Sequence, residues 1–596
     1  MVLPKKAPMV LGIHVKHDAS VALCSSDGVV AAVAEERISR IKHHCGFPRQ
    51  ALETVLKTAG VSPAEISAVA FTTRRVLYPE HKKTFSIDAA GKESVEPAVS
   101  PSATRAWAKR IVYGESNDHK KKTENPFPER HWLRFQDYLK EIGLMRGDVP
   151  FFYIAHHRAH AASAFRLSGF SEACVVTLDG VGDGLCGTIY KGSADGTMEL
   201  LRSSAAKDSL GHFYQAVTEA LGFVPVDGEY KTMGLAAFAD PHGENPFRDI
   251  VRVEDGVMRS NIHWNLRDFN KVYPEKALPN PLISIAQADE FKKYLDTMTR
   301  EDFSYYAQEH CEKNMADYVR DATRLTASKN IAAAGGVMLN VKGNARIRDE
   351  LKPDNFFVFP DSGDSGLAAG AAMEALYQMD ALKGRVKFGN PYLGHEFSDD
   401  EIKKDIDAVV STGEFSVQDA TPMLITEKLI QGKVIGTFHG RLEMGPRALG
   451  NRSVLADPRN NAVKDRINKI LKGREPFVPF APSLMEEEAH RFWEGGGEYR
   501  YMTFAVPAND FAKKEVPAVV HVDGTMRPQT VSKEWNPWFY DILKEFKAKT
   551  GIGLLLNTSF NRHGLPIVGS PRDALEHLVS GWVDGVVVGE WYVEGK

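Results

Sequence analysis

The sequence predicts an α/β protein in which an N-terminal unit contains an internal duplication and a second α/β domain follows. Two segments, 9–37 and 173–197, share one pattern: an apolar strand ending near an aspartate, a small-residue turn, a second strand and an Asp-Gly hairpin turn. A run rich in Gly, Pro and Asn at 386–398 then interrupts the pattern. We therefore expect two domains, 1–388 and 389–596.

The part after this break has apolar runs and periodic segments of its own. It carries predicted strands at 434–438, 553–556 and 585–588, and predicted helices at 461–472 and 572–580. Its length of about 200 residues is enough for an independent core, since domains average roughly 150 residues.

Composition excludes several classes of protein. The chain has 596 residues, 43% hydrophobic and 26% charged, with a net charge of −4, so no overall positive field attracts nucleic acid. Its five cysteines form no CxxC pair, which favours reduced thiols and a cytoplasmic location. No signal peptide and no apolar run of about 18 residues is present, so we expect no membrane partner.

The first hairpin carries His17-Asp18 in the turn between its strands. A carboxylate can orient an imidazole, which titrates near neutral pH and could then deprotonate an alcohol. An exposed histidine beside a turn-capping aspartate explains the pair equally well, and both interpretations stay open. The tight turns of both hairpins could also hold phosphate through backbone N–H groups.

Three histidines stand within five positions of the Ala-rich stretch IAHHRAHAASAF at 154–165, which predicts a helix. His156 and His160 are one turn apart and share a face, as two metal ligands would. A polar helix end is an equal alternative when this stretch is taken alone. Two imidazoles with the carboxylates of Asp179 and Asp364 would suit Fe(II), Mn(II) or Zn(II). No Glu follows His156, which argues against a zinc protease.

Glycines and charged residues mark further ligand sites in the N-terminal unit. NIAAAGGVMLN at 330–340 reads as a buried strand running into Gly335-Gly336 and a helix, where the backbone can approach a ligand closely. FVFPDSGDSGLAAG places Asp361 and Asp364 between a strand and a small-residue helix. Lys231, in EYKTMGLA, is expected in a Gly-bounded turn where it could neutralise phosphate.

The C-terminal domain concentrates donors that suit a polyphosphate and a small amide. Arginines bind phosphate in a bidentate manner, and neighbouring glycines let backbone amides join them. Four blocks, at 439–459, 472–483, 526–531 and 556–575, make a polyanion site the favoured interpretation, although no Walker motif occurs. The candidate nucleotide-binding residues are Arg441, Arg447, Arg452, Lys472, Arg474, Arg527, Asn557, Ser559, Asn561 and Ser570.

Together these blocks resemble the ATP-dependent O-carbamoyltransferase family, whose members carbamoylate antibiotics and nodulation factors. The resemblance spans most of the chain, and GPRALGNRS and LNTSFN are its most specific parts. The matching stretches are HDAS at 17–20, EERISRIKHH at 35–44, HHRAHAASAF at 156–165, EYKTMGLA at 229–236, AGGVMLN at 334–340, GRLEMGPRALGNRS at 440–453, PFAPS at 479–483 and LNTSFN at 556–561.

The resemblance implies a fold and a reaction. The N-terminal domain would be similar to the threonylcarbamoyl-transfer protein of tRNA modification, with the duplicated actin/sugar-kinase/heat-shock ATPase fold, and the C-terminal domain to the YrdC fold. ATP, with Mg²⁺, and carbamoyl phosphate would give carbamoyl adenylate in the C-terminal domain. The carbamoyl group would then pass to a hydroxyl of a small-molecule natural product, as in antibiotic biosynthesis.

The family also implies roles for particular residues. His156, His160, Asp179 and Asp364 would hold a metal, usually iron, with Asp361 as the second choice for the last ligand. His17, Asp18, Lys472 and Arg527 would be catalytic, and Lys231, Gly335, Gly336 and Asn340 would contact the nucleotide. Val478 departs from the family, which often has Arg there. The regions 75–145 and 245–325 match no motif and are expected to shape acceptor choice; a homodimer is compatible with the sequence.

Two other functions remain open at this point. A tRNA-modifying transferase could use the same folds on RNA, although the net charge disfavours it. A non-catalytic nucleotide-binding regulator could use an actin-like fold, but would not need the Arg-rich C-terminal blocks.

Overall fold

The computed structural model describes most of the chain. The described residues are 7–72, 84–87, 93–96, 138–262, 264, 266–268, 272, 284–286, 288–382 and 385–596. Most of the region 75–145, expected to shape acceptor choice, therefore lies outside the described residues.

The first sheet of the N-terminal unit combines three antiparallel strands with further strands that are added in parallel. Its order is β3-β2-β1-β4-β7-β5-β6, with β1–β3 antiparallel and β1, β4 and β7 parallel. Gly28 takes the positive φ of 121° that the predicted Asp-Gly turn requires. The strands are β1 Met9–His14, β2 Ser20–Ser25, β3 Gly28–Ala34, β4 Ile66–Phe71, β5 Thr84–Ile87, β6 Glu93–Glu96 and β7 Phe151–Ile154.

The second sheet repeats this topology. Its order is β10-β9-β8-β15-β16, again with three antiparallel strands followed by two parallel ones. The strand order β3-β2-β1-β4-β7 corresponds step by step to β10-β9-β8-β15-β16, so the predicted duplication and the actin-like fold class are confirmed. The strands are β8 Ala173–Gly182, β9 Leu185–Gly192, β10 Met198–Ala205, β15 Asn330–Ala334 and β16 Asn355–Val358.

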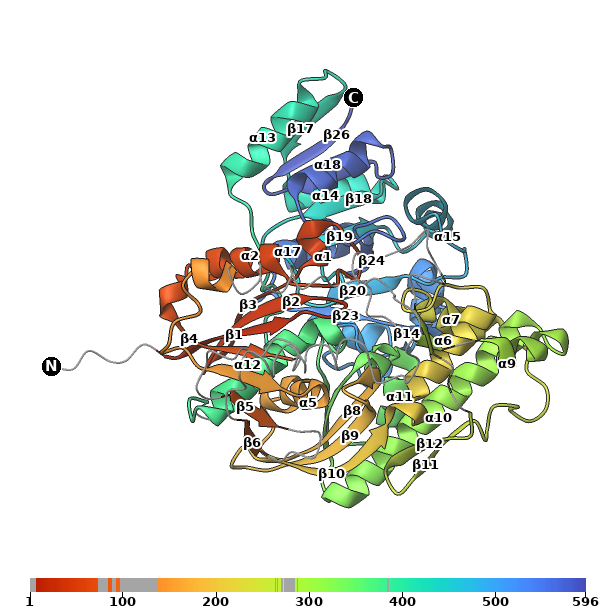
Figure 1. Cartoon of the computed structure of the whole chain (residues 1–596). Coiled ribbons are helices and arrows are strands. Elements are labelled where there is room, and N and C mark those ends of the chain that lie inside the picture. The colour runs from red at the N-terminus through yellow and green to blue at the C-terminus, as the bar shows by residue number, and fades with distance from the viewer. Residues whose placement is uncertain are drawn as a thin grey trace.

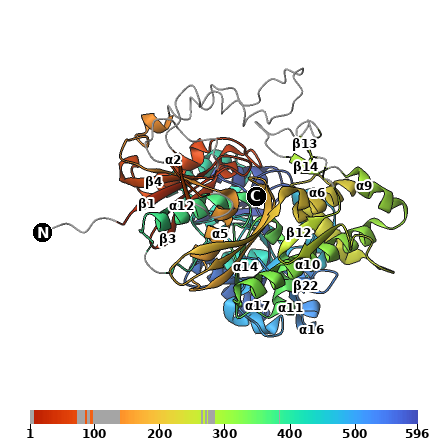
Figure 2. The same cartoon turned by 60° about the horizontal axis from the view of Figure 1, so that its bottom comes forward.

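Two helices lie between the sheets, and each packs on the sheet of the opposite half (Figures 1 and 2). Helix α5, His156–Arg166, follows the first sheet but packs on β8 and β15, whereas α12, Leu367–Gln378, follows the second but packs on β1 and β2. Small residues allow this contact: a Cβ on Gly370 would lie 1.9 Å from the carbonyl oxygen of Ala159. The outer faces are covered by α2, Arg49–Ala59, and by α10, Arg300–Thr326.

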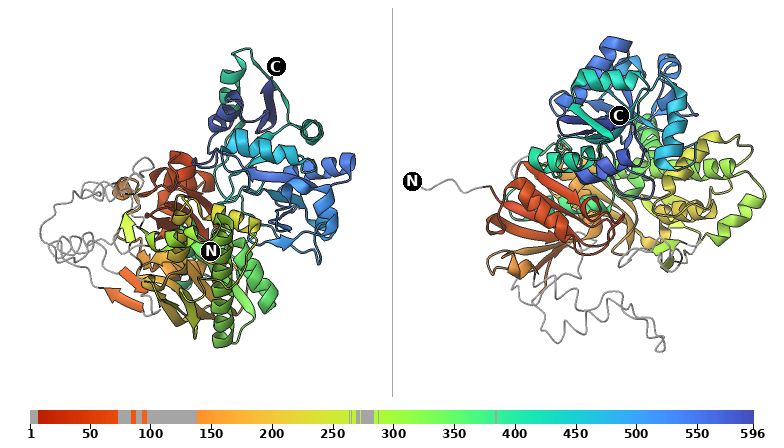
Figure 3. Two further views of the ribbon diagram at one scale, coloured as in Figure 1. Left: turned by 90° about the vertical axis from the view of Figure 1, so that its right-hand side faces the viewer. Right: turned by 90° about the horizontal axis from the view of Figure 1, so that it is seen from above.

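The C-terminal part forms one eight-stranded mixed sheet with its own hydrophobic core (Figure 3). Its order is β17-β26-β25-β18-β19-β24-β20-β23, and the strands and helices predicted there are confirmed. The strands are β17 Phe415–Asp419, β18 Ile435–Phe438, β19 Arg452–Ala456, β20 Ala481–Met485, β23 Gln529–Val531, β24 Leu554–Ser559, β25 Gly585–Val588 and β26 Trp591–Gly595.

The C-terminal helices flank this sheet, and the predicted helix at 461–472 continues as a π turn through its second half. They are α13 Asp399–Val410, α14 Pro422–Ile430, α15 Asn461–Arg466, α16 Asp510–Glu515, α17 Pro537–Thr550 and α18 Pro571–Val579, with a small strand pair β21 Val506–Pro507 and β22 Thr525–Met526.

The remaining elements belong to the N-terminal unit. They are α1 Glu36–Ser39, α6 Leu210–Ala220, α7 Glu229–Leu235, α9 Asp289–Lys292, α11 Val341–Leu351, β11 Val251–Glu254, β12 Val257–Ser260, β13 Leu266–Asp268 and β14 Ser284–Ala286. Among the described residues, no helix combines the length and the apolar character that crossing a membrane requires.

The two parts of the chain meet along the segment that contains α1. Arg37 donates through Nη2 to the carbonyl of Gly445 at 3.0 Å, and Arg40 donates to the carbonyls of Pro566 and Ile567. A Cβ on Gly569 would lie 1.7 Å from the carbonyl oxygen of Arg37, so the backbones are in direct contact. This seam closes one side of a large cavity between the parts.

Candidate active site

A cavity of about 1460 Å³ lies where the N-terminal unit meets the C-terminal part. Its N-terminal wall includes His17, Asp179 and Asp364, and its C-terminal wall includes Arg447 and Lys472. Residues that are far apart in the sequence therefore face one continuous space. The volume is larger than most small-molecule sites, which run from about 300 to 1,000 Å³.

The four predicted metal ligands come together at the N-terminal wall. One ligand atom from each of His156, His160, Asp179 and Asp364 lies within 4.8 Å of the others, and all four residues are buried. His156 Nε2 lies 3.1 Å from Asp179 and 3.6 Å from Asp364, and His160 Nε2 lies 3.6 Å from Asp364. Asp361 is not part of this cluster, so Asp364 is the better candidate for the last ligand.

The donor set fits a divalent cation. Within the described part of the chain, both ring nitrogens of His160 are buried without a hydrogen-bond partner. A buried imidazole is normally satisfied, so an orphaned one beside two carboxylates indicates a missing ligand. Burial would raise the pKa of Asp364, but the imidazoles of His156 and His17 outweigh it and hold that pKa below its usual range. The carboxylate is thus ionised, as metal binding requires.

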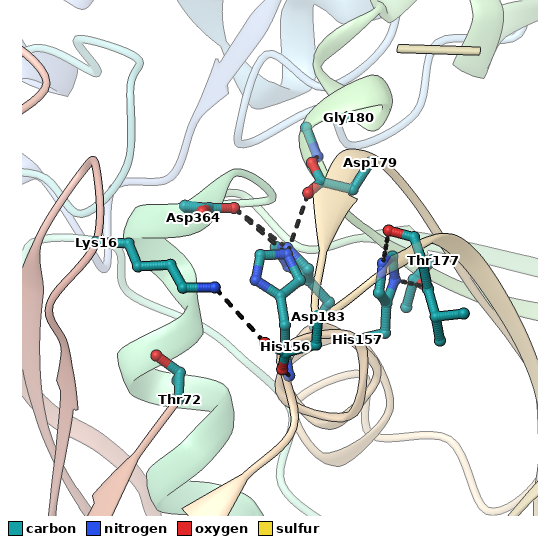
Figure 4. Close-up of polar contacts among 12 residues, drawn as sticks. Lys16, Thr72, His156, His157, Thr177, Asp179, Gly180, Asp183 and Asp364 are labelled. Atoms are coloured by element: carbon teal, nitrogen blue, oxygen red, sulfur yellow. Dashed lines mark hydrogen bonds and ion pairs between the residues drawn. The ribbon is translucent and has the colours of Figure 1, made fainter. Parts of the chain in front are cut away.

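Local structure explains which histidines face the cluster (Figure 4). Helix α5 begins where the Asp183 carboxylate accepts hydrogen bonds from the His156 amide and the Tyr153 hydroxyl, both at 2.9 Å. The remaining histidine of the run, His157, points away from the cluster. Its Nδ1 lies 2.7 Å from Thr177 Oγ1, and its Nε2 lies 3.1 Å from a backbone carbonyl. Burial lowers the pKa of His157 to about 3, so it is a neutral structural residue.

His17 stands between a carboxylate and the metal cluster. Its Nδ1 lies 3.0 Å from Asp18, and its Nε2 lies 3.3 Å from Asp364. Asp18 is held in turn by His43 Nδ1 at 2.8 Å. Burial lowers the pKa of His17, but the carboxylates of Asp364 and Asp18 outweigh it and raise that pKa to about 9. The arrangement orients the imidazole, as the sequence predicts for an alcohol-activating pair.

The C-terminal wall presents cations without matching carboxylates. Across the described residues, Arg447, Arg474 and Arg527 form no salt bridge. Burial lowers the pKa of Arg447 to about 10, and burial together with two neighbouring guanidinium groups holds that of Arg527 well below its usual range. Uncompensated cations in a partly buried wall favour a polyanionic ligand.

Lys472 organises the same wall. Its Nζ lies within 3.0 Å of four oxygens, the carbonyls and side-chain oxygens of Ser559 and Asn561. These contacts tie the π turn at 467–472 to the loop after β24. Lys472 therefore shapes the loop, while the three arginines are the freer anion donors.

Comparison with known proteins identifies the family. The model described as "Carbamoyltransferase N-terminus" matches residues 9–373, and "Carbamoyltransferase C-terminus" matches 426–595. This chain belongs to the carbamoyltransferase family. Its similarity to the nodulation protein NolNO of Sinorhizobium fredii is 33% identity, covering 97% of this chain and 79% of that protein. Nodulation protein NolO of Bradyrhizobium diazoefficiens is 34% identical over 74% of this chain and 79% of its own length.

Solved structures give a more distant likeness. Component A of (R)-2-hydroxyglutaryl-CoA dehydratase from Acidaminococcus fermentans is 12% identical, with a TM-score of 0.32, over 63% of this chain and all of that chain. HypF from T. kodakarensis is 15% identical, with a TM-score of 0.27, over 51% of this chain and 49% of its own. The fold of this carbamoyltransferase is accordingly assigned from its strand order.

Most of the residues predicted from the sequence reach the cavity of the carbamoyltransferase. His156 and His160 lie behind its surface, in the metal cluster. The predicted residues that line the cavity are His17, Asp18, Asp179, Gly336, Asn340, Asp364, Arg447, Lys472, Arg474, Arg527, Asn557, Ser559 and Asn561.

Two predicted phosphate-binding arginines have structural partners instead. Arg452 donates to the carbonyls of His439 and Gly440, at 3.0 and 3.1 Å, and its guanidinium lies 3.6 Å from the centre of the Phe438 ring. Arg441 donates to the carbonyls of two residues just after the predicted domain break, at 2.7 and 3.1 Å. Neither residue lines the cavity, because backbone carbonyls already bind both guanidinium groups.

Three other predicted contacts also lie away from the cavity wall. Ser570 is the N-cap of α18, where its hydroxyl accepts the Asp573 amide. Lys231 lies within helix α7, which corrects the predicted turn, and its Nζ pairs with Glu475 at 3.0 Å. Gly335, at φ 105°, is required by packing, since a Cβ there would lie 2.1 Å from the Leu178 carbonyl.

The structure adds residues that sequence reasoning missed. Lys42 and Asp227 form an ion pair on the cavity wall, and Lys42 lies in the quoted segment 35–44. Glu443 accepts three backbone N–H groups and so fixes the loop that presents Arg447. Gly336 was predicted as a nucleotide contact, and the structure adds that its amide donates to Asp179 at 2.8 Å and so orients a candidate metal ligand. For Lys42, the signal in the sequence was its place in the segment 35–44, which matches the family.

Proposed function

We propose that the protein forms carbamoyl adenylate from ATP and carbamoyl phosphate and transfers the carbamoyl group to a hydroxyl of a small molecule. The observation that carries this proposal is one cavity with two different walls: one holds arginines that form no salt bridge among the described residues, and the other adjoins a cluster of candidate metal ligands. We assign adenylation to the predicted domain 389–596 and transfer to 1–388.

The first step requires a site for several negative charges. Water converts carbamoyl phosphate into carbamate and phosphate, and a carbamate oxygen then attacks the α-phosphorus of ATP while pyrophosphate leaves. Arg447, Arg474 and Arg527 would bind the phosphates and stabilise the charge that develops, with Mg²⁺ accompanying ATP. Val478, which is 2% exposed, lies on the same wall and offers no charge there.

The second step requires an activated alcohol. The acceptor oxygen attacks the carbamoyl carbon, and AMP leaves with the electron pair of the broken C–O bond. His17 would take the acceptor proton at Nε2, because Nδ1 is occupied by Asp18. A divalent cation such as Fe²⁺, held by His156, His160, Asp179 and Asp364, would supply Lewis-acid polarisation of the carbamoyl carbonyl.

Two carboxylates contact the ring of His17: Asp18 lies 3.0 Å from Nδ1, and Asp364 lies 3.3 Å from Nε2. Both carboxylates raise the pKa of His17, and coordination of Asp364 to a cation would weaken its share of this effect. Unprotonated Nε2 is the form that can accept the proton of the acceptor.

Pyrophosphate release from the purified protein tests the proposal. ATP is supplied with and without carbamoyl phosphate, in the absence of an acceptor, for the wild type, Arg447→Ala and His156→Ala. We expect release that depends on carbamoyl phosphate, falls at least 100-fold in Arg447→Ala and survives in His156→Ala. Absence of release in every arm would contradict adenylation and favour a nucleotide-binding regulator. Carbamoyl transfer to tRNA, assayed in parallel, would favour the RNA alternative.

A further inference from the structure

Asp361 is a buried carboxyl that neither half of the proposed reaction uses. It lies three residues before Asp364, in the turn between β16 and α12, and only 4% of its surface is exposed. Its side chain lines the cavity. A Cβ on Gly445 would lie 3.4 Å from the Cα and Cβ of Asp361, so the residue also borders the C-terminal part. It therefore stands between the metal cluster and the loop that carries Arg447.

The partners of Asp361 differ from those of the other acidic residues in the cavity. Its one hydrogen bond among the described residues comes from the hydroxyl of Ser365. Each of the other cavity carboxylates accepts a hydrogen bond from a backbone amide or pairs with a histidine, lysine or arginine; these are Asp18, Glu36, Asp179, Asp183, Asp227, Glu229, Asp364 and Glu443.

A buried carboxyl with a single hydroxyl partner has unused acceptor capacity. Two carboxyl oxygens can accept about four hydrogen bonds, and the hydroxyl of Ser365 fills one of these positions in Asp361. Such a group persists where a ligand completes its hydrogen bonds. The ligand must offer N–H or O–H donors at a point between the two walls of the cavity.

The carbamoyl group has this chemistry. Its carbonyl oxygen is an acceptor suited to a cation, and its amino group presents two N–H donors that need acceptors. A group held between the metal cluster and the arginines would bring its amino end near the turn at 361–365. The remaining cavity carboxylates already have partners, which leaves Asp361 to accept these hydrogens.

We propose that Asp361 binds the amino group of the carbamoyl moiety and thereby selects carbamoyl over other acyl groups. The inference rests on the proposed function, because it presumes a carbamoyl adenylate in the cavity. A site built to bind an N–H strongly rejects an analogue that lacks it, since its own polar group is then left unpaired. Ser365 positions the carboxyl through its hydroxyl.

A matched pair of stable analogues tests this role by binding alone. 5′-O-(N-carbamoylsulfamoyl)adenosine and 5′-O-(N-acetylsulfamoyl)adenosine differ only in an amino group replaced by methyl. Calorimetric titration of the full-length protein should show the carbamoyl analogue binding about 10-fold more tightly, which is the upper end expected for one hydrogen bond. In Asp361→Ala, the preference should fall to about 2-fold or less, while affinity for the acetyl analogue stays unchanged.

Further variants keep the test decisive. Asp361→Asn retains an acceptor oxygen without charge and should show an intermediate preference; it replaces Asp361→Ala if that variant does not fold. Glu229→Gln, on the same cavity wall, should keep the wild-type preference. Equal affinity of the wild type for both analogues, or an unchanged preference in Asp361→Ala, would overturn the role of Asp361 while adenylate recognition stands. Failure of the wild type to bind either analogue would overturn the proposed function and, with it, this inference.

Discussion

Removing the carboxylate of Glu374 should loosen the contact between α12 and α5, the helix that carries the two histidines of the metal cluster. Glu374, on α12, accepts Arg158 Nε at 3.0 Å and Arg166 Nε at 2.7 Å, and both arginines lie on α5. The three side chains are 0%, 6% and 1% exposed, respectively. Glu374→Ala therefore leaves two buried guanidinium groups without a counter-charge, at a cost of about 3–5 kcal/mol.

Hydrogen exchange measures this cost locally, which suits a chain with several cooperative units. The opening free energy of amides in α5 and α12 should fall by about 3–5 kcal/mol in Glu374→Ala, and the affinity for an added divalent cation should fall with it. Glu576→Ala breaks an exposed pair with Arg572 and should change stability by about 0.5 kcal/mol or less. A loss below about 1 kcal/mol in α5 and α12 would refute the reasoning.

Two further predictions concern the same helices. Gly370→Ala should destabilise the α5–α12 contact by about 3 kcal/mol, because the new Cβ would overlap the Ala159 carbonyl, whereas Gly147→Ala, in open space, should stay within about 0.5 kcal/mol in urea unfolding. The pKa of His157 is about 3 in the folded state, below the value of 6.5 in the unfolded state. The stability that neutral His157 contributes is therefore present above pH 6.5 and is lost as the pH falls toward 3. At pH 5 the loss is about 2 kcal/mol, and His157→Asn should remove that part of the pH dependence; identical pH slopes would contradict it.

Periodicity and turn chemistry predicted most of the scaffold. The hairpins, the Ala-rich helix at 156–166 and the C-terminal strands are local features, set by residue spacing and by glycines such as Gly28. The histidine pair of the metal cluster was also accessible from the sequence, because His156 and His160 share one helix face. In both cases the information lies within about ten neighbouring residues.

The sequence did not predict which partner each donor binds. Arg447 and Arg452 stand five residues apart in one motif, yet one faces the cavity and the other is bound by backbone carbonyls. The difference depends on how the loop folds around Glu443, which residue type does not encode. The contact between Lys231 and Glu475 was not predictable either, because the two residues lie 244 positions apart in the sequence.

The exchange of α5 and α12 between the two sheets determines how the four candidate metal ligands can come together. His156 and His160 belong to the first half of the duplicated unit, whereas Asp179 and Asp364 belong to the second. Each half thus holds only two of the four donors and leaves the helix-binding face of its own sheet uncovered. Two separate chains, one for each half, could assemble this donor set only as a heterodimer, so the duplication joins in one polypeptide what would otherwise depend on concentration.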